Sequence, residues 1–278
     1  MIEKFDNRVK PAWCGGCTNF GILSAVKKSF VKLNLEPHKI VLVSGIGQAA
    51  KLPHYLNCNV FNGLHGRALP VATGIKAVNS ELTVITVCGD GDFYGEGGNH
   101  FLHTIRRNPD ITSLVHNNQV YALTKGQASP TTDLGTKTRL QFDGVKEEPL
   151  NPLLLAITMN CSFVARGFAG NIEHLSEIIS EGIKHKGFSL IDIIQPCVTF
   201  GKHQVPWYKD KIYYLDNTYD ATNKEEALKK ATEWTEKIPV GIIYKTNKNY
   251  IFPGEEKNLI KEQKLSKETL NDLISSFK

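Results

Sequence analysis

The sequence predicts an α/β protein built on a doubly wound, mostly parallel sheet. Short apolar segments that suit buried strands alternate with longer segments whose apolar residues recur at helical spacing. Several of the strand-like segments, such as 83–87 and 111–115, are apolar throughout. Such segments are typical of parallel strands that helices cover on both faces. Polar residues cluster directly after these two strands, at the edge of the sheet where doubly wound proteins bind ligands.

The individual elements follow from the same two patterns. Segment 20–31 has apolar residues at helical spacing, and Thr18-Asn19 is expected to cap this helix. The run 40–43 predicts a short strand that ends in a Ser-Gly-Ile-Gly turn, and small residues in the helix 69–78 allow close packing on a sheet. The remaining elements expected up to Pro196 are strands at 83–87, 111–115, 163–165 and 188–194, and helices at 97–107, 153–158 and 172–184.

The composition of the chain changes after about residue 200. Aromatic residues and lysines lead into a charged amphipathic helix at 224–236, a strand at 239–244 and a Lys/Glu-rich helix at 253–278. No repeat or low-complexity linker separates this part from the rest. We therefore predict one domain with a cysteine-containing site at 1–200, and a C-terminal extension at 201–278 that packs on the domain or on a partner subunit.

Length and charge exclude several functional classes. The 278 residues are 41% hydrophobic and carry a net charge of +5, with the lysines spread rather than gathered in a stripe, so we expect no nucleic-acid binding. No apolar stretch approaches the roughly 20 residues of a membrane span, and residues 1–10 contain no signal-peptide core. We expect a cytoplasmic protein, in which the six cysteines serve metals, redox chemistry or packing.

The most specific motif is Gly89-Asp90-Gly91-Asp92, which follows one predicted strand, together with Asn117-Asn118 after the next. Asp and Asn oxygens suit an octahedral Mg²⁺ that also binds phosphate. Glycines let the backbone approach a diphosphate, and the amino end of the following helix attracts an anion. The spacing resembles the thiamine diphosphate signature. The plain alternative is a glycine-rich turn with a capping aspartate.

The cysteines form a second candidate site. Cys14 and Cys17 lie in one turn before a helix, at a spacing that binds a single metal centre, and Cys197 follows a strand in Gln-Pro-Cys. Spacing alone leaves zinc, an iron–sulfur cluster and a dithiol open. The other three cysteines are expected to be small, buried packing residues: Cys58, Cys88 and Cys161.

With these motifs in order, the chain resembles the β subunit of 2-oxoacid:ferredoxin oxidoreductases, the pyruvate and 2-oxoglutarate synthases. The resemblance runs nearly end to end and implies a thiamine diphosphate-binding (PP-type) domain with a C-terminal extension. Its motifs are Trp13–Gly21, Ser44–Gly47, Leu64–Ala68, Gly89–Asp92, Arg106–Asn108, Asn118–Thr131, Gln195–Phe200 and Asp220–Trp234.

The resemblance implies roles for individual residues. Asp90 and Asn118 would hold Mg²⁺ through their side chains and Val120 through its carbonyl. His65 and Lys51 would act near the thiamine phosphates and the substrate carboxylate; the alternatives are a structural loop histidine and a surface lysine. The cofactor-binding residues would be Ile46, Gly47, His65, Gly89, Gly91, Asp92, Leu123 and Thr124, although Leu123 also suits strand packing.

One position departs from the family. A [4Fe–4S] cluster in the family takes four cysteines, and Cys14, Cys17 and Cys197 match three of them, whereas Gln48 stands at the fourth. A neutral amide is a poor iron ligand beside thiolates. Three outcomes remain open: the cluster persists with Gln48, water or another ligand; Cys58 supplies the missing thiolate; or the site is altered or empty.

The implied activity is oxidative decarboxylation of a 2-oxo acid to acyl-CoA and CO₂, with electrons passed through the cluster to ferredoxin. The chain offers no second domain for the glutamate that thiamine chemistry needs. That glutamate and the coenzyme A site would belong to an α (or α and γ) subunit, so the chain alone would be inactive. The alternatives are a subunit of a non-redox 2-oxo acid decarboxylase and a non-catalytic binding subunit. The sequence does not choose the 2-oxo acid.

Overall fold

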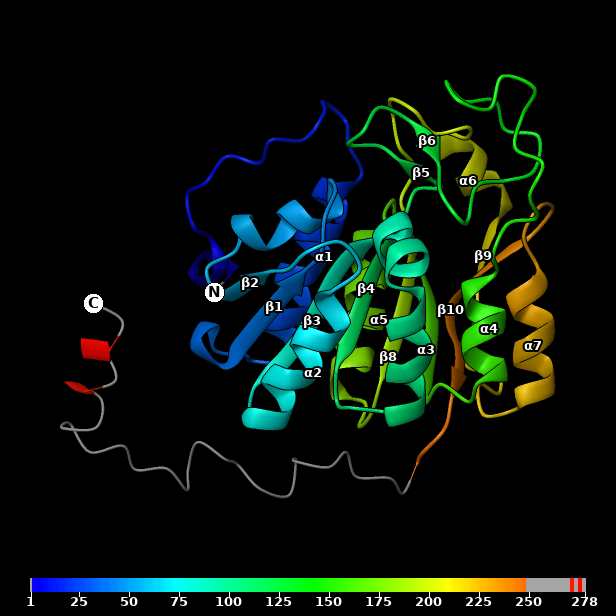
Figure 1. Cartoon of the computed structure of the whole chain (residues 1–278). Coiled ribbons are helices and arrows are strands. Elements are labelled where there is room, and N and C mark those ends of the chain that lie inside the picture. The colour runs from blue at the N-terminus through cyan, green and yellow to red at the C-terminus, as the bar shows by residue number, and fades with distance from the viewer. Residues whose placement is uncertain (1, 249–270, 273–274, 277–278) are drawn as a thin grey trace.

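The computed structural model describes residues 2–248, 271–272 and 275–276. Its centre is an eight-stranded sheet in the order β2-β1-β3-β4-β8-β7-β10-β9 (Figure 1). Neighbours from β2 to β7 run parallel, β10 is antiparallel to β7, and β9 is parallel to β10. The predicted doubly wound, mostly parallel sheet is confirmed. The strands are β1 (Ile40–Ser44), β2 (Asn59–Asn62), β3 (Thr83–Gly89), β4 (Thr112–Asn117), β7 (Phe163–Phe168), β8 (Ser189–Ile194), β9 (Ile212–Tyr214) and β10 (Ile238–Lys245).

Helices cover both faces of the sheet (Figure 1). One face packs against α1 (Asn19–Lys32) and α5 (Ile172–Lys184), and the resulting core continues to Leu52 and Tyr208. The opposite face packs against α2 (Ala68–Val78), α3 (Gly98–Arg107), α4 (Pro152–Thr158) and α7 (Lys224–Thr232). The shorter elements are η1 (Ile2–Phe5), η2 (Pro37–Lys39), η3 (Ala49–Tyr55), η4 (Gly91–Glu96), α6 (Val205–Lys211), β5 (Val120–Tyr121) and β6 (Gln127–Ala128).

The two-sided cover explains why the strands are apolar throughout. Every residue of β1, β4, β7 and β8 is buried, so neither face of these strands tolerates solvent-facing polar side chains. Some of their polar side chains bond to a neighbouring strand, as where the Thr86 hydroxyl of β3 donates to Ser113 of β4 at 2.8 Å, whereas the Ser44 hydroxyl of β1 is buried without a partner. Burial of these side chains supplies the main driving force that holds the carboxyl edge in place.

Asparagine caps define where several helices begin. The side chains of Asn151, Asn171 and Asn223 accept backbone N–H bonds at the starts of α4, α5 and α7. The expected cap of α1 is different, because Thr18 has helical backbone angles and makes no side-chain cap bond. Its hydroxyl instead donates to the carbonyl of Pro196 at 3.0 Å. Thr18 therefore joins two loops at the carboxyl edge.

The described part of the C-terminal extension continues the main sheet. β9 and β10 add two strands beside β7, and α7 packs into the same core as α4. The expected helix 224–236 ends earlier, at Thr232, and the expected helix 253–278 lies almost wholly outside the described residues. The domain boundary near residue 200 stays a prediction. Among the described residues, no helix has the length and apolar character to cross a membrane.

Candidate cofactor site

The loops after β1, β3, β4 and β8 meet at the carboxyl edge of the sheet, which is the upper edge in Figure 1. Asp90 follows β3 directly, and only 1% of it is exposed. Asn118 follows β4, and its backbone N–H donates to the Asp90 carboxylate. The structure thus brings together two of the three residues that the sequence predicts as magnesium ligands.

Neutral donors surround the buried carboxylate of Asp90. The hydroxyls of Ser129 and Thr131 both donate to Oδ2, the latter at 2.7 Å. Burial raises the pKa of Asp90 to about 6, while these hydrogen bonds oppose the rise. Asp192 is the charged neighbour that raises this pKa further, and no described cation offsets it. A divalent cation at this carboxylate would supply the missing positive charge.

Asn118 and Val120, the other two predicted magnesium ligands, lie on either side of Gln119 in the turn after β4. Gln119 adopts a left-handed conformation, with φ of 58°, between Asn118 and Val120. Oδ1 of Asn118 accepts the N–H of Val120 at 3.1 Å, and its Nδ2 donates to Gln195 at 3.0 Å. A carboxylate, an amide oxygen and a main-chain carbonyl form a donor set that suits Mg²⁺ with two phosphate oxygens. The residues present therefore fit a Mg²⁺–diphosphate group.

Asp92 joins three loops of the edge. Its Oδ2 accepts the N–H of Ile46 at 3.0 Å, and its Oδ1 accepts the N–H of Gly66 at 2.7 Å. A Cβ on Gly45 would lie 1.8 Å from this carboxylate, so the contact requires glycine there. Asp92 thus holds the loop that contains Ile46 and Gly47 against the turn after β3. This structural role was missed in the sequence, and the predicted cofactor contact of Asp92 stays a prediction.

The glycines of the turn also accommodate a tyrosine. Residues 91–96 form a short π-helix, η4, an element that is frequent at functional sites. A Cβ on Gly91 would lie 2.4 Å from the ring of Tyr121, and one on Gly95 would lie 2.7 Å from its hydroxyl. Of the glycines at 89, 91, 95, 97 and 98, only Gly89 and Gly98 face open space. The ring of Tyr121, which the sequence did not single out, therefore covers this turn.

The remaining predicted residues lie on loops of the same edge. His65 is exposed; burial raises the pKa of the Asp92 carboxyl, and the charge of nearby His65 opposes that rise. Lys51, in η3, donates to the carbonyl of Ala12 at 3.4 Å. Leu123 is 45% exposed, and Thr124 donates to Gln127 at 2.6 Å in the turn between β5 and β6. These side chains reach the edge from separate loops, and their roles stay predictions.

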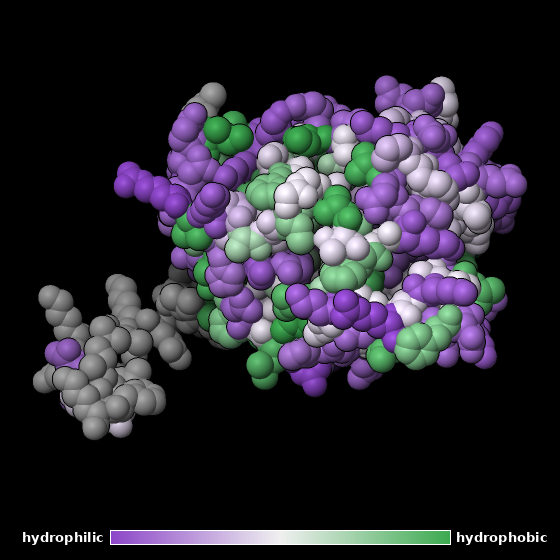
Figure 2. All heavy atoms as spheres, turned by 90° about the horizontal axis from the view of Figure 1, so that it is seen from above, coloured by the Kyte–Doolittle hydropathy of each residue, from purple (hydrophilic) through white to green (hydrophobic). Residues whose placement is uncertain are grey.

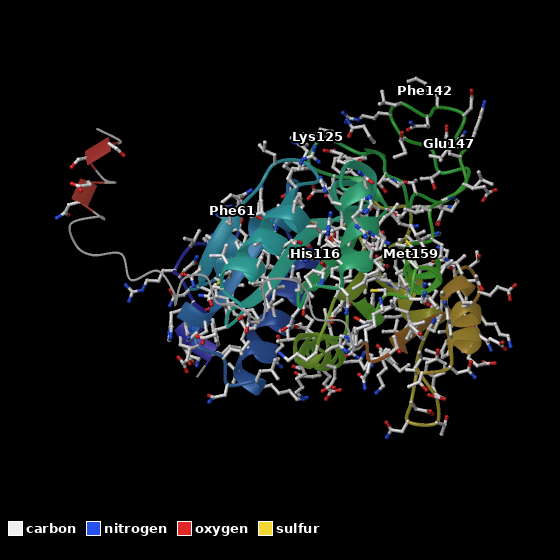
Figure 3. The ribbon with its side chains drawn as sticks, turned by 60° about the horizontal axis from the view of Figure 1, so that its bottom comes forward. Phe61, His116, Lys125, Phe142, Glu147 and Met159 are labelled. Carbon is white, nitrogen blue, oxygen red and sulfur yellow. The ribbon has the colours of Figure 1, made fainter. Side chains whose placement is uncertain are left out.

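A cavity of about 300 Å³ opens beside Val120. Its lining combines the ring of Phe200 with four cationic side chains and one carboxylate. These charged residues are Lys125, Lys137, Arg139, Lys202 and Asp133. Figure 3 shows Lys125 on a loop at the periphery of the molecule, far from the enclosed His116. The excess of positive charge suits an anionic ligand.

A buried polar network lies behind Asp90. Asn117 accepts the Thr131 hydroxyl at 3.0 Å and donates to both oxygens of Asp192 at 3.2 Å. Tyr94 donates to Asp192 at 2.8 Å, and Arg166 stands opposite Asp192 on the neighbouring strand. Burial raises the pKa of Asp192, and Arg166 opposes that rise. The network supports Thr131, and no local sequence signal identifies it.

Two loops bring the three predicted cluster cysteines to one place. The Thr199 hydroxyl donates to Sγ of Cys14 at 3.5 Å, and Thr18 donates to Pro196, the residue before Cys197. The pKa of Cys17 is raised, mainly by burial and also by the negative charge of Cys197 and Cys14. Within the described chain, no three His, Cys, Asp or Glu side chains form a site for a single metal ion.

Gln48 lies beside this cysteine loop. Its carbonyl accepts the indole N–H of Trp13 at 2.9 Å. Its side-chain Oε1 is buried and has no hydrogen-bond partner. Cys58, by contrast, precedes β2, whose first residue pairs with Val41 near the start of β1. Cys58 therefore lies at the amino edge of the sheet, about 15 Å from the cysteine loops at 3.3 Å per strand residue.

Two family models match the chain. The model of the C-terminal TPP-binding domain of thiamine pyrophosphate enzymes matches residues 42–193, and that of the C-terminal part of the pyruvate ferredoxin oxidoreductase beta subunit matches residues 197–257. The first match covers β1 to β8, including the loops that carry Asp90 and Asn118. The second covers Cys197 and the strands that extend the sheet.

Similar proteins share this architecture over most of their length. 2-Oxoacid:ferredoxin oxidoreductase 1, subunit beta, of Aeropyrum pernix is 44% identical over 87% of this chain and 80% of its own, and the subunit beta of Saccharolobus solfataricus is 46% identical over 84% and 81%. A solved 2-oxoglutarate:ferredoxin oxidoreductase from Magnetococcus marinus, with 2-oxoglutarate, coenzyme A and succinyl-CoA bound, superposes with a TM-score of 0.89 at 32% identity, over 100% of this chain and 96% of that one. The chain belongs to the β subunits of the 2-oxoacid:ferredoxin oxidoreductases.

Proposed function

We propose that this subunit anchors thiamine diphosphate through a Mg²⁺ ion held by Asp90, Asn118 and the Val120 carbonyl. The single observation that carries the proposal is the buried Asp90 carboxylate. It receives only neutral hydrogen bonds and stands next to Asn118 at the edge where such sheets bind ligands. A cation that also binds a diphosphate offsets the burial of this charge.

The reaction we propose is the oxidative decarboxylation of a 2-oxo acid to acyl-CoA and CO₂. When bound, thiamine diphosphate supplies the electron sink for cleaving the bond between the carboxylate and keto carbons. The chain itself positions this group: Asp92 fixes the loop of Ile46 and Gly47, and Gly89 leaves open space at the end of β3. Leu123 and Thr124 would border the reacting end of the cofactor, His65 would hold its phosphates, and Lys51 would bind the substrate carboxylate.

Cys14, Cys17 and Cys197 would hold an iron–sulfur cluster, which would supply the electron route from this subunit to ferredoxin. The names of the similar β subunits support the ferredoxin acceptor and an α partner. We assign the catalytic glutamate and the coenzyme A site to that partner. The cationic cavity beside Val120 suits an anionic substrate, such as a 2-oxo acid.

A non-redox 2-oxo acid decarboxylase subunit is the second candidate. Gln48 favours it, because a missing thiolate weakens the case for a cluster. The gathering of Cys14, Cys17 and Cys197 at one edge favours the oxidoreductase, since a decarboxylase needs no three thiols there.

The test uses the complex of this chain with its α partner, purified without oxygen. It is given pyruvate, 2-oxoglutarate or a branched 2-oxo acid with coenzyme A, and CO₂, acyl-CoA and reduced ferredoxin are measured. We expect all three products, in equal amounts of CO₂ and acyl-CoA. Asp90→Asn should abolish them together with Mg²⁺-dependent cofactor binding, whereas the exposed control Asp210→Asn should not. Release of CO₂ without ferredoxin reduction would favour the decarboxylase.

A further inference from the structure

A relay of side-chain amides joins the proposed magnesium site to the cysteine loops. Nδ2 of Asn118 donates to Oε1 of Gln195 at 3.0 Å, and Nε2 of Gln195 donates to the Thr18 hydroxyl at 2.9 Å. That hydroxyl donates to the carbonyl of Pro196 at 3.0 Å. At the other end, Oδ1 of Asn118 accepts the N–H of Val120 at 3.1 Å. The relay therefore begins and ends on backbone groups.

The backbone groups at its ends give the relay a single direction. An amide side chain has one donating and one accepting end, whereas the Val120 N–H only donates and the Pro196 carbonyl only accepts. Reversing the Asn118 amide would point its NH₂ group at the N–H of Val120. Reversing the Gln195 amide would point its oxygen at the Pro196 carbonyl, which lies 3.3 Å from Nε2. Each of the two amides thus has one favourable orientation.

This direction decides which atom Asn118 offers to a cation. Mg²⁺ takes oxygen ligands, so it binds the oxygen of an amide side chain and not its NH₂ group. Oδ1 of Asn118 has two lone pairs, and since the Val120 N–H takes one, the other can bind a metal ion. Gln195 holds the Nδ2 end of the same amide. The oxygen is therefore kept in place before any cation binds.

Gln195 is itself firmly held. It directly follows β8, only 2% of it is exposed, and its N–H donates to the carbonyl of Asn117 at 2.9 Å. The last residues of β8 pair with those of β4, as where Ile194 lies opposite Asn117. The proline at position 196 further restricts the backbone of Gln195. The paired ends of two central strands thus place the amides of Gln195 and Asn118 side by side.

Resting on the proposed function, in which Asn118 binds Mg²⁺, we infer that Gln195 is the positioning residue that presents the Asn118 oxygen, and not its NH₂ group, to the cation. Gln195 acts through Asn118 and supplies no metal ligand of its own. The same side chain reaches Thr18, which directly follows Cys17. The orientation of the metal ligand thus depends on the loop that carries the cysteine pair.

The test compares two substitutions of Gln195 in the α–β complex, freed of its cofactor. Gln195→Glu keeps an accepting oxygen for Nδ2 of Asn118, and its second oxygen can accept the Thr18 hydroxyl. Gln195→Met has a similar length and removes both hydrogen bonds. Calorimetric titration with thiamine diphosphate and Mg²⁺ should show nearly wild-type affinity for Gln195→Glu and about 10- to 100-fold weaker binding for Gln195→Met.

Two comparisons separate positioning from a general effect on folding. Gln204→Met is the matched control, because the exposed Gln204 also donates to a backbone carbonyl of this loop, that of Cys197 at 3.4 Å, and it should bind the cofactor as the wild type does. In an Asn118→Asp background both ends of the side chain are oxygens, so Gln195→Met should no longer weaken binding. The Tm of each cofactor-free complex shows that a variant is folded, and Gln195→Leu is a second apolar variant.

Two results would overturn the inference while leaving the proposed function intact. One is wild-type affinity in a folded Gln195→Met or Gln195→Leu complex. The other is an equal loss of affinity from Gln195→Glu and Gln195→Met, or from Gln195→Met in both Asn118 backgrounds, which would show a general effect on the loop. A wild-type complex that binds thiamine diphosphate equally well with and without Mg²⁺ would instead contradict the proposed function.

Discussion

A single carboxylate, Asp90, links the folding of this subunit to its cofactor. Its side chain is buried among hydroxyls and backbone N–H groups, with no described cation beside it. A folded protein tolerates such a group because the rest of the core is large, and because a bound cation removes the penalty. The residue that we propose as the cofactor anchor is therefore expected to be a source of instability when the cofactor is absent.

The pH dependence of this effect has a definite sign. Burial raises the pKa of Asp90 from 3.8 to about 6, so the folded apoprotein binds a proton more tightly than the unfolded chain does. The stability of the apoprotein should therefore fall as pH rises from about 4 to about 6, by about 3 kcal/mol at 1.36 kcal/mol per pKa unit. Asp90→Asn should raise the Tm of the apoprotein at pH 7.5 and remove the Tm rise caused by Mg²⁺ with thiamine diphosphate. An apo Tm lowered by this substitution would contradict the prediction.

The hydroxyl of Thr131 should matter through Asp90. It donates to the carboxylate at 2.7 Å and contacts Asn117 at 3.0 Å, so it orients the proposed metal ligand. Thr131→Val keeps the shape and removes these bonds, and should weaken Mg²⁺-dependent cofactor binding about 10- to 100-fold. Thr136→Val is the matched control, because the Thr136 hydroxyl is buried without a partner. Titration of both variants with the cofactor by calorimetry checks the difference, and equal affinities would refute it.

Among the elements, the π-helix η4 depends on close contact with the loop after β2. Gly66 has a φ of 65°, and a Cβ there would lie 2.4 Å from the backbone of Glu96. The N–H of Gly66 also donates to Asp92. These contacts connect two segments that are far apart in sequence, the loop after β2 and η4, so moving the loop displaces the turn that carries Asp90.

Gly66→Ala should therefore push the loop and η4 apart. We expect a loss of stability above about 1 kcal/mol, since the left-handed backbone and the contact are both affected, together with weaker cofactor binding. Gly74→Ala is the control, because Gly74 is exposed within α2 and faces open space. That change should stabilise the protein by about 0.5–1 kcal/mol. Urea denaturation should show lower stability for Gly66→Ala and higher stability for Gly74→Ala than for the wild type, and cofactor titration should show weaker binding for Gly66→Ala. A Gly66→Ala protein with wild-type stability and binding would contradict the packing argument.

At the scale of the whole molecule, the sequence was sufficient for the architecture and only partly for the site. Apolar runs and helical spacing are local signals, so β1, β3, β4, β7 and β8 and the helices α1 to α5 were correctly predicted in order, whereas the short strands β2, β5 and β6 were missed. The contacts of Asp92 with Ile46 and Gly66 span 46 and 26 residues, and no local pattern reveals them. No local pattern reveals the packing of the Tyr121 ring on Gly91 either, or the hydrogen bond from Thr18 to the carbonyl of Pro196 that replaces the expected cap of α1.

The carboxyl edge as a whole carries apolar side chains that a single subunit leaves open. Leu64, Leu134, Leu140 and Phe142 are each more than half exposed on loops, and Figure 2 shows apolar residues among the polar ones in the view from above. The loop of Phe142 extends beyond the sheet in Figure 3. Exposed apolar side chains beside a binding site suit contact with another protein, which agrees with the proposed α partner.

Three carboxylates of this edge are engaged in structural hydrogen bonds, which supports our expectation that the partner supplies the proton donor for the reaction. Asp90 and Asp92 are held by hydroxyls and backbone N–H groups, and Asp133 accepts bonds from Gln119 and Trp234. The purified chain should therefore bind Mg²⁺ with thiamine diphosphate, seen as a rise in Tm, yet release no CO₂ from a labelled 2-oxo acid. Adding the α partner should restore release, because we propose that it brings the catalytic glutamate to the same cofactor. Turnover by the pure chain would place that acid within this subunit and remove the need for a partner.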